Sequence, residues 1–432
     1  MNVLSLLSAS QNFIDFAVEK IGSVNLNWIG KLISWLFDIF SGVSGGVIIG
    51  VIVFTLCLKT IVLPLDIYSK VKTKKQSLIM EKMRPQMEKL QKQYANDKTM
   101  YSQKVMELQK QNGYSPLGAC LPMVISLVIF IVVMGAFSTY SNFAIINTYN
   151  NMVDAYNASV EVYVQTSTED TDAKHFLIGE NGNYKVEFNS FTEHYCAEKK
   201  FSDAEKNSFL TEFNNKTEAE KLKTVGDFVR VNAQRAAADY YYNNNKVNRF
   251  GWIGNVWYPD SMLNKVVPDY SKFKSSISRA SNGSDTASYE ESYNEVTYFL
   301  THVDPERPEI TEKKLPAKTY NGYFVLIVLA IGLMFLQQFI MSRTQKATNE
   351  LSSVDGSAAK TNKWIMIIMP IMFGIFSFFY SAAFSTYMII STVYGLISTL
   401  IINKIVAVTF EKRGDAYLLK KNKSTNTRKR LK

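Results

Sequence analysis

Residues 46–65 read GVIIGVIVFTLCLKTIVLPL and carry one charged side chain, that of Lys59. A helix of about 20 predominantly apolar residues crosses the ~30 Å hydrocarbon core of a bilayer. The stretch therefore predicts a transmembrane helix and places the chain among membrane proteins. A charge inside such a helix costs about 3 kcal/mol on insertion scales, so Lys59 is a candidate functional residue.

The remaining apolar sequence falls into further blocks. The longest block, 364–410, has Lys404 as its only charge. A single helix of that length would measure ~70 Å at 1.5 Å per residue, about twice the hydrocarbon thickness, so we expect a turn at Tyr380–Ser385. The sequence thus predicts an all-α polytopic membrane protein with five spans: 46–65, 117–137, 323–341, 364–380 and 386–406.

The polar segments alternate in charge, although the whole chain carries +10. A basic balance fits nucleic acid, anionic lipid or cytoplasmic loops. Lys and Arg exceed Asp and Glu by 6 in 66–115, by 2 in 342–363 and by 8 from Lys404 onward, whereas 140–319 has an acidic excess of 6. The positive-inside rule then predicts the location of each segment. The predicted cytoplasmic segments are 66–115, 342–363 and the tail 411–432, and the predicted extracellular ones are 1–24 and 140–319.

Residues 25–42 precede the first span and contain a narrow polar stripe. Asn27, Lys31, Ser34 and Asp38 recur at spacings of four, three and four among Leu, Ile, Trp and Phe. Such an amphipathic helix suits the membrane interface, with its wide apolar face in the lipid. A buried helix of a soluble domain would show the same pattern and is the alternative.

Segment 66–115 is polar but has apolar residues every three or four positions, which predicts two amphipathic helices. A break at Ala95–Asp97 separates them, so we expect a helical hairpin. Pro85 should kink the first helix or mark its start. The predicted apolar faces contain Ile79, Met83, Met87, Leu90 and Tyr94, followed by Met100, Val105 and Leu108.

The long loop 140–319 is hydrophilic in composition. FLIGENGNYKVEF (176–188) predicts a β-hairpin around Asn181–Asn183, and residues 215–243 have the apolar period of a helix. We therefore expect a small α+β domain inserted in the loop, whose function the sequence does not indicate.

Lys59 allows two interpretations. Its four-carbon stem could snorkel to the cytoplasmic end of the span, ~10 Å away, or its charge could serve a polar cavity. Thr55, one turn earlier on the same face, favours the cavity modestly. Gln337, near the end of the third span, and Tyr387, in the fifth, fit ordinary helix–helix hydrogen bonding equally well.

Several motifs occur in the order seen in one family. They are LCLKTIVLPL (56–65), SPLGACLPMVISLVIFIVVMGAF (115–137), RFGWIGNVWYPDS (249–261), FLQQFIMS (335–342), IMPIMFGIFSFFYSAAFSTY (368–387) and FEKRG (410–414). With them the chain resembles the YidC-type membrane protein insertases of bacterial plasma membranes. Three departures stand out: Lys59 where the family usually has arginine, a turn SAAFSTY without the family's Pro-x-Gly character, and an insert at about 145–245.

The resemblance implies a membrane protein insertase and chaperone with five helices around a hydrophilic groove, open to cytoplasm and lipid. It implies that Lys59 attracts acidic tails of nascent membrane proteins, and that Thr55, Gln337 and Tyr387 line the groove. It also implies that the hairpin and the basic tail contact the ribosome, with membrane lipids and a Sec translocon as further candidate partners. We expect no cofactor, metal or catalytic residue, since no P-loop and no metal-ligand pattern is present.

Two other classes stay open from the residues alone. A secondary transporter or channel would use Lys59 as its ion or substrate site, although such proteins usually show internal repeats and none is seen. A membrane-anchored receptor would place its function in 140–319.

Overall fold

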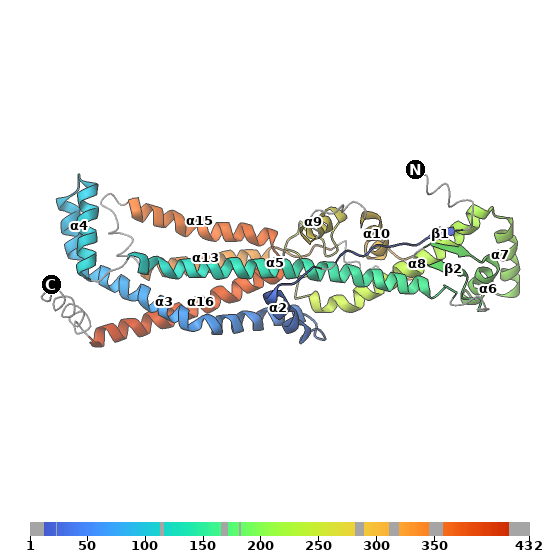
Figure 1. Ribbon diagram of the computed structural model, residues 1–432, viewed down its shortest axis with the longest axis horizontal. Coiled ribbons are helices and arrows are strands. Elements are labelled where there is room, and N and C mark those ends of the chain that lie inside the picture. The colour runs from blue at the N-terminus through green and yellow to red at the C-terminus, as the bar shows by residue number, and fades with distance from the viewer. Residues whose placement is uncertain are drawn as a thin grey trace. The chain divides into compact units, whose positions relative to one another are not determined.

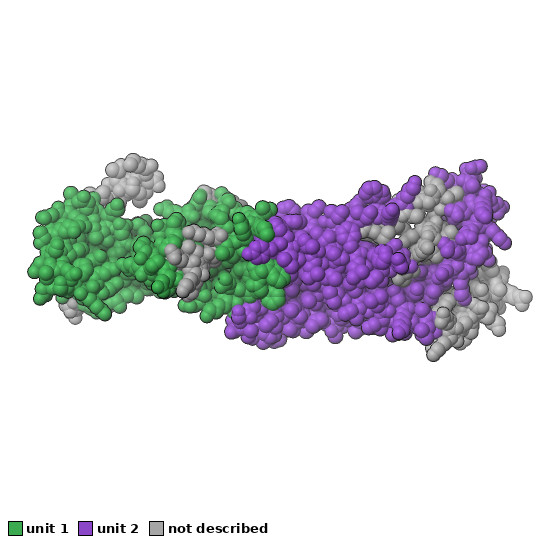
Figure 2. All heavy atoms as spheres, turned by 180° about the vertical axis from the view of Figure 1, so that it is seen from behind, with its two compact units in different colours: residues 1–27, 139–257, 262–321 green, residues 28–138, 258–261, 322–432 purple. Residues whose placement is uncertain are grey.

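The computed structural model describes residues 13–22, 24–112, 116–165, 172–180, 183–280, 289–310, 319–344 and 357–413. Several predicted features lie outside these ranges, among them most of the basic tail, the middle of the linker 342–363 and the turn residues Asn181 and Gly182. The side chains of 116–127, which carry part of the second-span motif, are also outside the described set. The chain divides into two compact units (Figure 2). Unit 1 comprises 1–27, 139–257 and 262–321, and unit 2 comprises 28–138, 258–261 and 322–432.

The regular elements of unit 2 in its described residues are all helices (Figure 1). It contains α2 (Trp28–Asp38), α3 (Gly46–Gln93), α4 (Lys98–Gln111), α13 (Val325–Thr344), α15 (Ser357–Phe379), α16 (Ala382–Arg413) and the first half of α5 (Pro116–Glu161). Four described helices are long and apolar enough to cross a membrane: Gly46–Gln93, Val128–Glu161, Val325–Arg343 and Ala382–Thr409. A shorter apolar stretch, Pro370–Phe379, lies in α15. The predicted all-α polytopic membrane fold is confirmed.

Helix α3 extends far beyond the apolar stretch from which the fold was predicted. It is continuous for 48 residues, with Pro64 and Pro85 both inside it. The predicted span boundary at residue 65 is therefore a change in polarity within one helix and not a helix end. Similarly, α5 continues past residue 137 to Glu161, into what the sequence indicated as loop.

The polar hairpin forms as predicted between the end of α3 and α4. Met80, Met83 and Met87 of α3 are buried against Tyr101 and Val105 of α4. The side chain of Asp97 accepts the backbone N–H of Met100 at 2.9 Å and caps α4, which explains the break in the pattern. Met100 was predicted to lie on the apolar face, and this was wrong, because its position beside the cap is exposed and Tyr101 faces inward instead.

Helix α2 is apolar on two sides. Ile33 and Phe37 are buried, and the Phe37 ring lies so close to α3 that a Cβ at Gly50 would come within 2.4 Å of its Cδ1 atom. Trp28, Leu32 and Trp35 are exposed and recur at helical spacing. An exposed apolar stripe of this kind suits the predicted position in the membrane interface.

Unit 1 confirms the expected α+β insert. Its elements are β1 (Phe13–Asp15), β2 (Leu177–Glu180), β3 (Asn183–Val186), α6 (Phe188–Glu198), α7 (Asp203–Asn215), α8 (Glu218–Asn244), η1 (Asn245–Asn248), α9 (Tyr270–Ala280), α10 (Tyr289–Val296) and α11 (Tyr298–Thr301). The predicted hairpin is the antiparallel pair β2–β3, and the predicted helix is α8. A third strand comes from the N-terminal segment, since β1 pairs antiparallel with β3 in the order β1–β3–β2.

The N-terminal segment is also fixed to the second half of α5. The Asn150 side chain accepts the backbone N–H of Ile21 at 3.0 Å and donates to the Ile21 carbonyl at 2.8 Å. The Tyr149 hydroxyl donates to the carbonyl of Glu19. An amide side chain with one donor and one acceptor thus pairs with an extended backbone as a neighbouring strand would.

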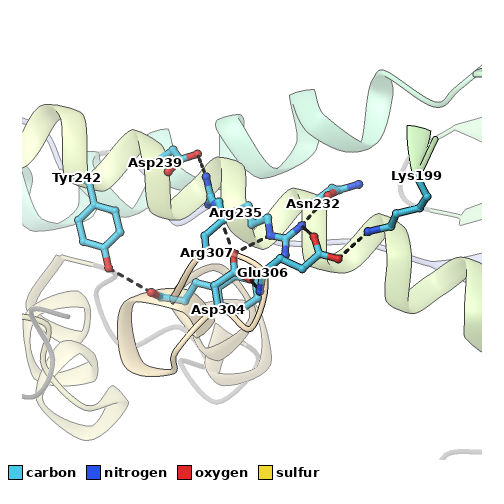
Figure 3. A network of polar contacts seen from close by, with 9 residues as sticks. Lys199, Asn232, Arg235, Asp239, Tyr242, Asp304, Glu306 and Arg307 are labelled. Carbon is cyan, nitrogen blue, oxygen red and sulfur yellow. Dashed lines mark hydrogen bonds and ion pairs between the residues drawn. The ribbon is translucent and has the colours of Figure 1, made fainter. Parts of the chain in front are cut away.

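A buried carboxylate joins α8 to the segment after α11 (Figure 3). Arg235 holds Asp304 through two bonds of 2.7 Å, and Arg307 adds a third of 3.1 Å. Although burial raises the pKa of Asp304, hydrogen bonds from Arg235, the backbone N–H of Glu306 and Arg307 outweigh it and lower the pKa to about 2. Charge-assisted bidentate bonding of this kind is strong and directional, so it fixes the segment against the helix.

Candidate functional site: a polar face between α3 and α16

One face of α3 carries a row of polar side chains through its apolar part. Thr55, Lys59, Asp66 and Lys70 follow at spacings of four, seven and four. At 100° per residue these spacings keep all four within a narrow sector of the helix. A charged and hydroxyl-bearing stripe thus runs from the apolar part of α3 into the polar part that follows residue 65.

Lys59, the predicted central residue, is half-buried. Its ammonium group forms no hydrogen bond or ion pair with any residue that the structure describes, and its charged neighbours are Asp66 and Lys70 of the same helix. Thr55 is fully buried, and its hydroxyl donates to the Val51 carbonyl at 2.6 Å. A lysine charge without a partner inside an apolar helix is costly, so it calls for a functional explanation.

Asp66 and Lys70 connect α3 to α16. Lys70 Nζ donates to Asp66 Oδ2 at 2.8 Å and to the Gly395 carbonyl at 3.2 Å. The Ser398 hydroxyl donates to the same Asp66 oxygen at 3.0 Å. Two polar contacts, Lys70 with Gly395 and Ser398 with Asp66, therefore join the two helices at this level, which we call the Asp66 end of the bundle.

Gln337 lies at the Asp66 end as well. A Cβ added to Gly395 would lie 3.3 Å from Gln337 Nε2, so α13 approaches α16 closely where Lys70 also reaches it. Gly395 is thus the position at which three helices meet, and the absence of a side chain there leaves room for both polar groups.

Tyr387 lies elsewhere on α16, in an aromatic cluster. It is buried, and its ring centroid is 5.6 Å from that of Phe137 on α5 and 5.9 Å from that of Phe384. Phe54 of α3 completes the cluster with an edge contact to Phe137 at 5.7 Å. Rings in these offset and edge geometries pack densely and leave little space for water.

The contacts set the register between α3 and α16. Asp66 contacts Ser398, and Phe54 and Tyr387 both contact Phe137, so the helices run in the same direction. Thr55 precedes Asp66 by 11 residues, or ~16 Å, and Tyr387 precedes Ser398 by the same distance. Tyr387 therefore lies at the level of Thr55, and residue 391 at the level of Lys59.

The segment 258–261 closes the opposite end of the bundle, which we call the Asp260 end. Asp260 is fully buried, and its carboxylate accepts the backbone N–H groups of Tyr323 at 2.8 Å and Leu326 at 2.6 Å. The first N–H groups of a helix have no acceptor within the helix itself, so Asp260 caps the start of α13. The Tyr258 carbonyl accepts the N–H of Ala382 at 3.0 Å, at the start of α16.

The structure thus distributes the four predicted site residues over three levels, with Lys59 in the middle. Thr55 and Tyr387 share one level, and Gln337 lies with Gly395 at the Asp66 end, beyond Lys59. Asp66, Lys70 and Ser398 were not predicted as site residues, although the seven-residue spacing from Lys59 to Asp66 places both side chains on one face of the helix. Within the part of the chain that the structure describes, no group of three or more His, Cys, Asp or Glu side chains is arranged to hold a metal ion.

Comparison with known proteins agrees with this architecture. A family model described as 60Kd inner membrane protein matches residues 39–177 and 287–409, which is more than half of the chain. The chain is 34% identical over 109 residues to the membrane protein insertase YidC of Fusobacterium nucleatum, covering 25% of this chain and 51% of that relative. It is 37% identical over 90 residues to the membrane protein insertase YidC of Clostridium perfringens, covering 21% and 36% respectively.

The chain spans about half or less of the length of these curated relatives. No solved structure matches it. The family match covers the apolar helices α3, α5, α13, α15 and α16, and it leaves out most of the insert, residues 178–286. The resemblance inferred from the motifs is confirmed, and the chain belongs to the 60Kd inner membrane protein family.

Proposed function

We propose that this protein inserts other membrane proteins into a bacterial plasma membrane and helps them fold. The proposed route runs along the polar face of α3 and α16, from the Asp66 end toward Lys59, and ends below the aromatic cluster around Tyr387. Such a face lowers the cost of carrying a polar segment part-way across the bilayer. The proposal involves no bond-making step, so it assigns no catalytic residue.

The main support for this proposal is the burial and bonding of the Lys59 side chain. It is half-buried in an apolar stretch of α3 and has no hydrogen bond or ion pair with the described residues. A positive charge at reduced dielectric attracts a carboxylate more strongly than it would in water. Lys59 is therefore suited to receive an acidic side chain of an incoming polypeptide.

Packing at the Asp260 end supports a route that is closed there. All nine residues from Ser381, just before α16, to Ile389 are buried. Together with the aromatic cluster, this buried segment supports a route that is closed at the Asp260 end.

Two contacts support a topology in which five spans cross the membrane in alternating directions. Strand β1 pairs with β3, so the segments before α3 and after α5 share one side of the membrane, which requires an even number of crossings between them. The Tyr258 carbonyl binds the Ala382 N–H, so the starts of α13 and α16 also share a side, with α13 and α15 between them. With the basic segments inside, the N-terminus is extracellular and the C-terminus cytoplasmic.

The proposed partners follow from this orientation. Nascent membrane proteins are the substrates, and the hairpin of α3 and α4 with the basic tail contacts the ribosome by charge. Membrane lipids contact the exposed stripe of α2, and a Sec translocon is a further partner to be tested.

Substitution of Lys59 tests the proposal. The readout is insertion of one-span reporter proteins with acidic translocated tails, in cells depleted of the protein and supplied with variants. We expect Lys59→Arg to restore insertion, and Lys59→Glu to lower it by about tenfold or more, because the charge reverses in a partly buried site.

Lys404 provides a matched control. It is the other lysine within the apolar part of these helices, on α16, and its side chain is exposed. Lys404→Glu should leave insertion close to that of the wild type. Normal insertion with both Lys59→Ala and Lys59→Glu would disprove the role of the charge and favour snorkelling. Depletion that leaves insertion intact but abolishes transport of a solute would favour the transporter class.

A further inference from the structure

We infer that Asp66 and Lys70 set the charge selectivity of the route past Lys59. The inference rests on the proposed insertase function and extends it to the choice of substrate. Lys70 neutralises Asp66, and this leaves the uncompensated Lys59 as the net charge of the face. The pair would thereby admit acidic segments that an unpaired Asp66 would repel.

Hydrogen bonds hold the side chains of Asp66 and Lys70 in defined positions. Asp66 Oδ2 receives Lys70 Nζ at 2.8 Å and Ser398 Oγ at 3.0 Å, and Lys70 also donates to the Gly395 carbonyl at 3.2 Å. These bonds hold the ammonium group of Lys70 between its own helix and α16. The carboxylate is thus compensated by one cation in a fixed place.

Asp66 and Lys70 are partly exposed, so a substrate can come close to their charges. The side chains of Lys70 and Asp66 are 18% and 28% exposed, so they are neither sealed in a core nor freely solvated. A polypeptide that moves along this face comes into their field, and screening by water is incomplete. Their charges therefore act on a substrate as well as on each other.

Lys59 lies close enough to Asp66 and Lys70 for the three charges to act on a substrate together. Asp66 is seven residues from Lys59, about 10 Å along the helix and on the same face. With Lys70 in place the three groups sum to one positive charge. Without Lys70 they sum to zero, and without Asp66 they sum to two positive charges. Removing Lys70 lowers the net charge of the face, and removing Asp66 raises it. The inference therefore predicts opposite effects of the two substitutions on insertion of an acidic substrate.

A purely structural role would act differently. If the pair only joined α3 to α16, breaking it from either side would weaken the protein for every substrate alike. The discriminating readout is therefore the dependence of insertion on the charge of the substrate tail.

The experiment uses the full chain in proteoliposomes and two one-span reporters, which differ only in two tail residues, Asp in one and Asn in the other. Insertion is measured by protection of the tail from protease. Lys70→Gln should lower insertion of the Asp reporter about fivefold, the size expected for one charge ~10 Å away in a partly polar site, and lower insertion of the Asn reporter much less. Asp66→Asn should raise insertion of the Asp reporter.

Two further variants sharpen the result. The double variant Asp66→Asn with Lys70→Gln restores the net charge of the wild type while it removes the contacts, so the Asp reporter should return to near the wild-type level. Lys72→Gln removes the same charge from the opposite face of α3 and should change neither reporter.

The outcomes separate the inference from the function on which it rests. If Lys70→Gln and the double variant lower insertion of both reporters equally, the inference of charge selectivity is wrong. The proposed insertase function would not be affected by that result. If neither reporter inserts better with the wild-type protein than in empty liposomes, the proposed function itself is wrong, and the inference is wrong with it.

Discussion

The Asp260 end and the Asp66 end of the helical bundle each depend on one aspartate, held in different ways. Asp260 is fully buried and binds backbone N–H groups at the start of α13. Asp66 is partly exposed and binds the side chains of Lys70 and Ser398. Backbone donors cannot leave without unwinding a helix, whereas side chains exchange partners by rotation.

The packing around the two aspartates follows the same division. The rings of Phe54, Phe137 and Tyr387 fill the bundle below the Asp260 end. At the Asp66 end, the helices are joined by polar groups around Gly395. The comparison indicates that one end is built for rigidity and the other for exchange, and four measurements can break or sharpen it.

The largest effect is expected for Gly322→Ala at the Asp260 end. The new Cβ would lie 1.8 Å from Asp260 Oδ1 and 2.8 Å from its Cα, so the buried carboxylate must move away from the N–H groups that it caps. Overpacking and loss of the cap together should cost about 3 kcal/mol or more. The measurement is thermal stability in detergent, followed by circular dichroism.

Gly332→Ala is the control for this prediction. It lies on the same helix, α13, and nothing is within 4 Å of its added Cβ, so it should be neutral or stabilising by up to about 1 kcal/mol. Equal stability of the two variants would show that the Asp260 end is as adaptable as the Asp66 end.

A second effect, about 2 kcal/mol, is expected from acid in unit 1, where Asp304 is a rigid carboxylate outside the bundle. Its pKa falls from 3.8 to about 2 on folding, so it stabilises the fold above pH ~4, and that stability is lost as the pH falls through 2. The stability difference between wild type and Asp304→Asn should therefore shrink between pH 5 and pH 2. A difference independent of pH would contradict the assigned ion pair.

A third effect concerns Tyr387→Phe, at the level of Thr55. The variant keeps the ring contacts with Phe137 and Phe384 and removes only the buried hydroxyl group. The free energy of unfolding should therefore change by about 1 kcal/mol or less. Insertion of acidic reporters should fall less than in Lys59→Ala. If the loss of insertion were as large, Tyr387 would contact substrate directly, and the route would extend to its level.

The smallest effect is expected for Gly395→Ala at the Asp66 end. Its Cβ would lie 3.3 Å from the Gln337 amide, the tip of a flexible side chain that can turn aside. The gain in helix propensity should offset the contact, leaving a change within about 1 kcal/mol in thermal stability. A loss as large as that of Gly322→Ala would remove the contrast between the two ends.

Much of the bundle could be predicted because hydrophobic blocks and their length constrain membrane helices strongly. The length of the apolar block predicted a turn, for which Tyr380–Ser385 was the best site, and the helices break at residues 380–381, since α15 ends at Phe379 and α16 begins at Ala382. Helix ends that do not coincide with a change in polarity could not be predicted. Residues 66–93 continue α3 without a break, since a helix can pass from lipid to water while its backbone bonds stay satisfied.

The candidate site could be predicted only in part. Lys59 was identified because a charge in an apolar run is conspicuous. Asp66 and Lys70 resembled the start of a soluble loop, and their role depends on contacts with Gly395 and Ser398, more than 320 residues away in the chain. Asp260 is conspicuous only through the two backbone donors of α13, which local sequence does not reveal.

Strand β1 also constrains the order in which the protein is made. It pairs with β3 across about 170 residues, a distant contact that forms late in folding. At ~5–20 residues per second, synthesis of the intervening chain takes roughly 10–35 s. In the proposed orientation, the first strand would have to cross the membrane and remain unpaired until α3 and α5 have been inserted and β3 has been made. The small sheet would then form only after both helices had crossed the membrane in the proposed directions.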